Sequence, residues 1–161
     1  MTAQIAERIY YKRKRYAMCT EPLNQYFDLS GGKPQFESHS TALWRGYIGT
    51  WEIVEGRLYL IELEANLMDG TTAQLNHLFP DFPDRVFAHW YTGKIQIPDG
   101  KLLEYVHSGY ESTYERDICI SIENGVVMEE RIVHNGTAEN PEGPDGYQIG
   151  GMTIFPKKGD A

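Results

Sequence analysis

The chain has 161 residues, of which 41% are hydrophobic and 24% charged, and its formal net charge is -8 at pH 7. This length is enough for one domain with a buried core, and the acidic balance argues against general nucleic-acid binding, which depends on a basic surface. The first residues, MTAQIAERIYYKRKRY, hold no apolar signal core, and no stretch approaches membrane-spanning length. The sequence therefore predicts a cytoplasmic protein with no membrane association.

The N-terminal part of the chain predicts a hairpin and then a short helix. The runs at residues 9–11 and 15–18 are rich in apolar and aromatic side chains, and the basic run at 12–14 lies between them as a solvated tip. Residues 21–29 are compatible with a short helix, and the Gly- and Pro-containing segment 30–40 is typical of a loop.

Strands dominate the centre of the chain. Residues 42–54 are rich in β-forming side chains, with Gly46 and Gly49 indicating a bulge or a close backbone approach. The Glu55-Gly56 pair predicts a tight turn, after which residues 58–63 return as a central strand. Residues 69–78 predict a helix, because Asp69 or Thr71 is a good cap and apolar side chains follow at helical spacing.

The second half predicts more strands joined by turns. Strands are expected at residues 86–91, 94–97, 102–107, 117–122 and 126–134. Turn signals separate them at residues 98–100 and, most strongly, at Asn124-Gly125. The fold class predicted is mainly β: an antiparallel β-sandwich or partly open β-barrel with one or two short helices. Residues 1–135 form the predicted domain, and the Gly/Pro-rich tail 136–161 is either partly flexible or adds an edge strand at 148–155.

A set of polar side chains shares its predicted strand faces with large apolar groups. Successive strand residues alternate between faces, so Arg45 and His89 are expected to point inward, and His107 and Glu130 with them. Buried polar groups need partners. The predicted ligand-binding set combines these polar groups with the aromatic residues around them: Arg45, Tyr47, Trp51, His89, Tyr91, Tyr105, His107 and Glu130.

Two interpretations of this set stay open. In the first it is a structural network, in which Arg45 pairs with Glu62 or Glu130 and the histidines bond to tyrosines or backbone. In the second it lines an aromatic cleft, and Arg45 anchors a small anionic, nucleotide-like ligand whose ring stacks on tyrosine or tryptophan. Glycine-associated register slips would reverse individual assignments.

Catalysis is the alternative function, as a small hydrolase or isomerase with His89 and His107 as acid and base. Neither histidine lies in a recognisable catalytic motif. Cys19 and Cys119 have no metal-binding or redox spacing, and reduced thiols are favoured while a disulfide stays open. No cofactor and no metal site is predicted, since the histidines lack ligand spacing.

The segment SGYESTYERD at residues 108–117 is a candidate protein-binding element. Tyr110 and Tyr114 lie four residues apart, as do Glu111 and Glu115, so one helical turn would place the tyrosines together beside the acids. Exposed tyrosines flanked by acids are typical of protein-binding surfaces. The alternative is that both tyrosines fold back over the edge of the sheet.

The strings Trp-Arg-Gly-Tyr and Leu-Glu-Tyr-Val-His, within ALWRGYIGTWEIVEGRLYL and VFAHWYTGKIQIPDGKLLEYVHSGYESTYERD, carry a resemblance. Over residues 5–135 the chain resembles a set of small uncharacterised bacterial proteins. The resemblance implies a bacterial or phage origin and a cytosolic location, but no activity and no catalytic residues. Small acidic accessory proteins of this kind often act as immunity or anti-defence factors.

The function predicted from the sequence is therefore that of a small acidic binding protein. It docks onto a partner protein or sequesters a small anionic ligand. The oligomeric state stays open, because an exposed edge strand would permit a dimer but nothing in the pattern of residues specifies one.

Overall fold

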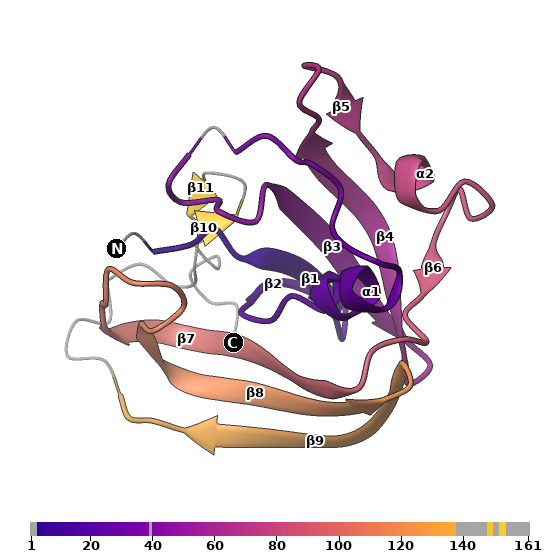
Figure 1. The fold of residues 1–161 in the computed structure, drawn as a ribbon. Coiled ribbons are helices and arrows are strands. Elements are labelled where there is room, and N and C mark those ends of the chain that lie inside the picture. The colour runs from indigo at the N-terminus through magenta and orange to yellow at the C-terminus, as the bar shows by residue number, and fades with distance from the viewer. Residues whose placement is uncertain (1–2, 39, 138–147, 150–151, 154–161) are drawn as a thin grey trace.

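The structure, a computed structural model, describes residues 3–38 and 40–137, together with the backbone of residues 148–149 and 152–153 (Figure 1). The elements, in chain order, are β1 (Glu7–Tyr11), β2 (Lys14–Met18), α1 (Leu23–Leu29), β3 (Tyr47–Val54), β4 (Arg57–Asn66), β5 (Thr72–Ala73), α2 (Leu75–Leu78), β6 (Val86–Phe87), β7 (Gly93–Glu104), β8 (Thr113–Glu123), β9 (Val126–His134), β10 (Gln148–Ile149) and β11 (Met152–Thr153).

The first nine strands form one mixed sheet, as the predicted mainly β class requires. Its order is β2-β1-β3-β4-β9-β8-β7, and β5 and β6 also pair with β4. All neighbours are antiparallel except β1 and β3, which are parallel because a long crossover through α1 connects β2 to β3.

The sheet curves but does not close into a barrel. β4 and β9 share a single residue pair, Arg57 with Val126. At the opposite ends of the order, the chain after β2 approaches β7, where the Cys19 N–H donates to the Gln96 carbonyl at 2.9 Å. The half formed by β7, β8 and β9 therefore lies across from the half formed by β1 to β4 (Figure 1).

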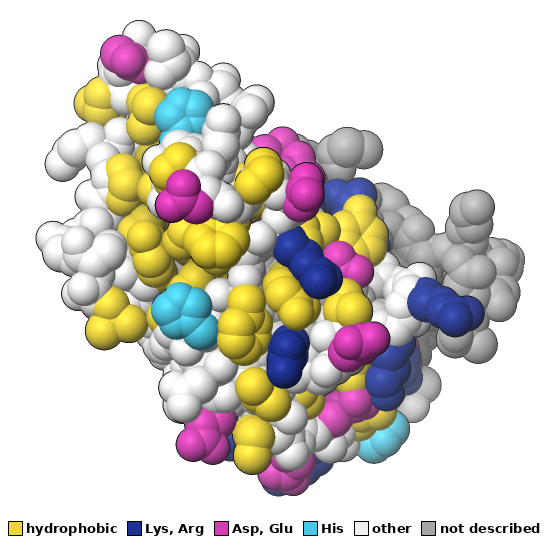
Figure 2. All heavy atoms as spheres, turned by 90° about the vertical axis from the view of Figure 1, so that its right-hand side faces the viewer, with side chains coloured by type: hydrophobic (Ala, Val, Ile, Leu, Met, Phe, Trp, Pro, Cys, Tyr) yellow, Lys and Arg dark blue, Asp and Glu magenta, His cyan; other side chains and the backbone are white. Residues whose placement is uncertain are grey.

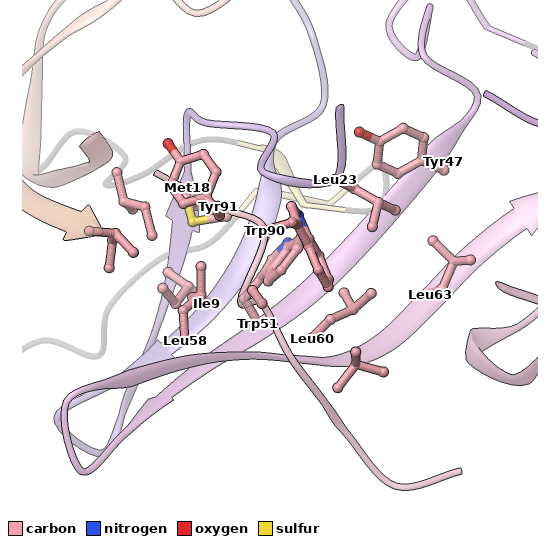
Figure 3. Close-up of a cluster of buried hydrophobic side chains, with 14 of the residues drawn as sticks. Ile9, Met18, Leu23, Tyr47, Trp51, Leu58, Leu60, Leu63, Trp90 and Tyr91 are labelled. Carbon is pink, nitrogen blue, oxygen red and sulfur yellow. The ribbon is translucent and has the colours of Figure 1, made fainter. Parts of the chain in front are cut away.

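The hydrophobic core fills the space between these two halves. Figure 3 shows Ile9, Trp51 and Leu60 from β1, β3 and β4 gathered with Leu23 of α1 and Trp90. The isoleucines of β7 and β8 complete the same cluster from the other half: Ile95, Ile97, Ile118, Ile120 and Ile122. The alternation predicted for these strands explains the arrangement, since every second side chain enters the core.

Turn chemistry confirms the predicted hairpins. Glu55 and Gly56 both have positive φ (51° and 75°), as do Asn124 and Gly125 (48° and 81°). This is the geometry of tight turns that match the twist of paired strands. A side chain at position 125 would meet the Ala88 carbonyl oxygen at 2.7 Å, so this glycine also allows the close approach of the chain after β6.

Several predicted elements are wrong in extent, among them the strand predicted at residues 86–91, of which only β6 forms. The helix predicted for residues 69–78 is reduced to α2, because Asp69 accepts hydrogen bonds from the Thr71 N–H (2.9 Å) and hydroxyl, and the chain then pairs with β4 as β5. The turn predicted at residues 98–100 is part of the long strand β7. A register shift between Asp99 and Leu102 absorbs the irregularity, with Gly100 at φ 87°.

Most of the predicted tail lies outside the described residues. β10 and β11 pair with each other in a separate two-stranded sheet. Neither described helix has the length or the apolar character that crossing a membrane would need. The cytoplasmic location stays a prediction.

Candidate functional site

Arg45 and Glu7 form a buried ion pair at the centre of the predicted site. Arg45 Nη2 lies 2.8 Å from Glu7 Oε2, and the two side chains are 6% and 0% exposed. The Gly49 N–H donates to the same carboxylate oxygen at 2.7 Å, and Trp51 Nε1 donates to Oε1 at 3.1 Å. Arg45 Nη1 donates to the Ile5 carbonyl at 2.7 Å. The carboxylate therefore joins β1, β3 and the segment that precedes β3.

A second carboxylate extends this network to α1 and to the loop after β7. Glu21 Oε2 lies 4.0 Å from Arg45 Nη1 and accepts the Tyr110 hydroxyl at 2.6 Å. Its other oxygen accepts Asn24 Nδ2 at 3.0 Å, and the Tyr47 hydroxyl donates to Asn24 Oδ1 at 2.8 Å. The Arg45 guanidinium also lies over the Tyr47 ring, 5.4 Å from its centroid. The network ties four separate chain segments together: residues 5–7, 21–24, 45–51 and Tyr110.

The electrostatics of this pair follow from its burial. Burial raises the pKa of Glu7, against the lowering effect of Arg45 and of the Gly49 and Trp51 donors. Burial is the largest single influence and would lower the pKa of Arg45, but Glu7, Tyr110 and Glu21 together outweigh it and the pKa rises above its ordinary value. Because all the groups that bond the Glu7 carboxylate are N–H donors, the ionised form of the pair is the one that satisfies them.

The partner predicted for Arg45 is wrong, although its inward orientation is confirmed. Glu62 is exposed, and Glu130 is held by the Tyr11 hydroxyl and by Lys12 Nζ at 3.0 Å. Sequence reasoning missed Glu7. The signal was present, because Glu7 alternates with Ile9 and Tyr11 and all three are buried.

The histidines do not join Arg45. His89 is exposed because β6 ends at Phe87 and the backbone turns, with the His89 N–H donating to the Phe87 carbonyl at 2.8 Å. Ala88 and Trp90 are buried instead, which reverses the predicted alternation. The rest of the predicted set divides into buried and exposed members: Tyr91 lies in the core, and Tyr105 and His107 are exposed after the end of β7 and bonded to each other.

Of the two alternatives for residues 108–117, the structure shows the one in which both tyrosines fold back. Tyr114 is a buried residue of β8, and Tyr110 folds inward to bond Glu21. Glu115 Oε1 accepts the Lys101 N–H at 2.8 Å, and Glu111 alone of the four points to solvent. No helical turn forms because strand pairing with β7 begins at Thr113.

A different combination of arginine, aromatic and histidine side chains lies on the outer face of β4 and β6. Arg85 Cζ lies 4.1 Å from the centroid of the Tyr59 ring, and Arg57 Cζ lies 5.7 Å from that of Phe87. The Tyr59 and Phe87 rings are 5.8 Å apart, since these residues pair across the two strands. His89 follows at 6.4 Å from Phe87. We call these five residues the Arg–aromatic surface.

The two guanidinium groups of this surface are exposed and available. Within the described part of the chain, neither Arg57 nor Arg85 has a carboxylate at ion-pair distance. Figure 2 looks at the side of the molecule where β4 and β6 lie, and there hydrophobic side chains are interspersed with basic and acidic ones. A guanidinium stacked on a ring keeps its N–H edge free for a carboxylate or phosphate.

Sequence reasoning missed this surface, although a signal for it exists. Arg57 and Tyr59 are two residues apart on one strand, and Arg85, Phe87 and His89 repeat the same spacing on another. Each run places its members on one face of an extended strand. The register between the runs, Tyr59 opposite Phe87, is visible only in the structure.

Two open grooves lie beside the far part of β4. One, of about 560 Å³, is lined by Arg8, Gly46, Glu64 and neighbouring residues, and Arg8 bonds Glu64 across it at 2.8 Å. The other, of about 520 Å³, is lined by Glu62, Glu64, Leu75 and others. Arg45 lines neither of these two grooves, and its side chain is only 6% exposed.

Neither metal chemistry nor similarity assigns a function. In the described ranges no three His, Cys, Asp or Glu side chains gather as metal ligands would, and no disulfide joins Cys19 to Cys119. No protein-family model matches the chain, and neither the curated proteins nor the solved structures include a match.

Proposed function

We propose that this chain is a non-enzymatic binding protein that docks onto an acidic segment of a partner protein through the Arg–aromatic surface. The observation that carries the proposal is the pair of exposed guanidinium groups, Arg57 and Arg85, held against aromatic rings without a carboxylate partner in the described residues. Arginine and aromatic residues dominate the binding energy of protein interfaces.

The stacked geometry supports recognition of an anionic group. Stacking on Phe87 and Tyr59 restricts the orientation of each arginine before binding, so less side-chain entropy is lost when a carboxylate is bound. The rings contribute apolar contact area beside the charge. The residue types are those of the set predicted from the sequence, but of that set only His89 belongs to this surface.

The shape of the surface favours a protein over a small ligand. The Arg–aromatic surface lies on the outer face of a sheet, and neither groove beside β4 includes its members. The faces of Tyr59 and Phe87 carry the arginines, so a nucleotide ring would have to displace them before stacking. An immunity or anti-defence role, which is frequent among small acidic accessory proteins, would be one form of such docking.

A binding assay on surface variants tests this proposal. The probe is a fluorescently labelled glutamate-rich peptide, and the variants are R57A, R85A and the double variant. R13A is the matched control, because Arg13 is an exposed arginine at the turn after β1 that makes no cation–π contact with a described residue. We expect the double variant to bind at least about tenfold more weakly, and R13A to change affinity by less than about twofold.

The outcomes separate the alternatives. Binding that is absent, or equal in wild type and double variant, would refute the Arg–aromatic surface as the docking site. If adenosine monophosphate binds with the same arginine dependence while the peptide does not, the surface captures a small anionic ligand instead. The enzyme alternative has no observation in its favour, since His89 contacts Phe87 and Trp90 while His107 bonds Tyr105.

A further inference from the structure

Among the described residues, strand β9 has an edge without a partner strand beyond Val126. On one side it pairs with β8 from Val126 to His134, with a register shift that leaves Met128 out of the pairing, but on the other it meets β4 only at Val126. Figure 1 shows β9 along the lower margin of the sheet, with no described strand beyond it. An unpaired edge presents a row of backbone N–H and C=O groups that can pair with another strand.

The side chains of this edge are exposed on both faces. Every residue from Met128 to Ile132 is exposed, and Met128 and Ile132 are among the exposed large hydrophobic side chains, at 61% and 48%. The adjacent strand β8 alternates instead, with Ile118, Ile120 and Ile122 buried. Two apolar side chains therefore flank three charged ones on an open edge.

We propose that this edge pairs with the same edge of a second copy, in an antiparallel register centred on Glu130. A two-fold axis perpendicular to the sheet leaves each face of the sheet on the same side in both copies. One residue must then face its own copy across the axis, and residues equidistant from it in the sequence pair with each other. Centred on Glu130, the register sets Glu129 opposite Arg131 and Met128 opposite Ile132, twice over.

Neighbouring registers lack this complementarity. A centre at Glu129 sets Met128 opposite Glu130, and a centre at Arg131 sets Glu130 opposite Ile132, so each places a charge against an apolar side chain. Opposite charges and apolar pairs stabilise cross-strand contacts, whereas like charges destabilise them. The run Val-Met-Glu-Glu-Arg-Ile-Val at residues 127–133 is thus self-complementary in one register only.

The central residue has its own counter-charge. In the proposed dimer the two Glu130 side chains face each other, but each is already bonded by Lys12 Nζ at 3.0 Å and by the Tyr11 hydroxyl. Glu130 pairs with the buried Ile120 and so lies on the inner face, while Glu129 and Arg131 lie on the outer face. Lys12, in the turn after β1, therefore neutralises the charge of Glu130 at the two-fold axis.

Sedimentation velocity on charge variants tests the register. Wild type is expected to form dimers as its concentration rises from about 10 µM to about 1 mM, because the paired edge is short. E129R alone and R131E alone each set like charges opposite one another, and we expect each to raise the dimer dissociation constant about tenfold. An equimolar mixture of E129R and R131E restores the opposite charges and should form a mixed dimer. Circular dichroism checks that each variant is folded.

Three results would overturn the proposal. Wild type that stays monomeric at every concentration would exclude the dimer, and slow amide exchange at residues 129–133 in that monomer would assign the edge to the chain's own C-terminal segment. A dimer that neither variant weakens would place the interface elsewhere. Variants that weaken the dimer without forming a mixed dimer would exclude this register.

Discussion

Arginine has opposite surroundings in two regions of this molecule. Arg45 is buried against Glu7, with its guanidinium bonded on two sides by protein groups. Arg57 and Arg85 lie exposed on the outer face of β4 and β6, each against an aromatic ring. The partner of a charged side chain therefore decides its role. A buried, paired arginine orders the fold, whereas a stacked arginine with a free N–H edge is available to a ligand.

The largest expected effect comes from breaking the buried pair. E7Q leaves the Arg45 charge buried without its counter-charge, so we expect the free energy of unfolding to fall by about 3–5 kcal/mol. Urea denaturation followed by tryptophan fluorescence measures it. E64Q is the matched control, because Glu64, which bonds Arg8, is 49% exposed, and it should cost less than about 1 kcal/mol.

A double variant sharpens this prediction. E7L/R45M removes both charges together and is expected to be more stable than E7Q, since no unpaired charge then stays buried. An E7Q protein as stable as wild type would mean that the pair does not order the fold, and that Arg45 is free for another role.

The next effect tests Tyr110, which the sequence made a candidate for partner binding. Y110F removes the hydroxyl that bonds Glu21 at 2.6 Å. A hydrogen bond to a charged group contributes about 1.5–3 kcal/mol, and we expect a loss toward the lower end of that range by urea denaturation. Peptide binding should be unchanged. Weaker binding with unchanged stability would return Tyr110 to the interaction surface.

The dependence of stability on alkaline pH tests the burial of Tyr91 in the core. Burial raises the pKa of Tyr91 to about 12, above the ordinary value near 10 that it regains on unfolding. The resulting stabilisation is present below about pH 10 and is lost as the pH rises through about 12.

The unfolding free energy of wild type should therefore fall more steeply above pH 10 than that of Y91F, by at most about 1.4 kcal/mol per pH unit. Urea titrations at several alkaline pH values measure the two slopes. Burial also raises the pKa of Tyr16, Tyr47 and Tyr110, so the variant keeps part of the slope. Identical slopes would mean that Tyr91 is not buried.

The smallest effect on stability belongs to the Arg–aromatic surface. R57A/R85A removes only exposed cation–π contacts, and we expect a loss below about 1 kcal/mol in total. Thermal and urea denaturation measure it. A loss of several kcal/mol would make these arginines structural, as Arg45 is.

The sequence predicted correctly those features of the fold that depend on neighbouring residues in the chain. Alternation in β1 to β4 identified Arg45, Tyr47 and Trp51 as inward-facing, and the Asn124-Gly125 turn located the last hairpin of the sheet. These features depend on neighbours within a few residues. Strand periodicity and turn residues are sufficient for them.

Long-range pairing explains what was missed. Glu7 and Arg45 are 38 positions apart and meet through the parallel pairing of β1 and β3, which no local pattern reveals. The sequence predicted the wrong face for His89 because β6 ends at Phe87, two residues before it. A shift of one residue in the alternation exchanges the two faces of a strand. The Arg–aromatic surface likewise depends on the register of Tyr59 with Phe87.

A heteronuclear NMR titration of the arginine side chains tests the contrast between the two regions most directly. The glutamate-rich peptide is added to the intact protein while the Nε–H resonances of all arginines are followed. We predict saturable shifts for Arg57 and Arg85 and none for Arg45, whose guanidinium is 6% exposed. Shifts at Arg45, or none at Arg57 and Arg85, would contradict the division of the arginines into structural and binding groups.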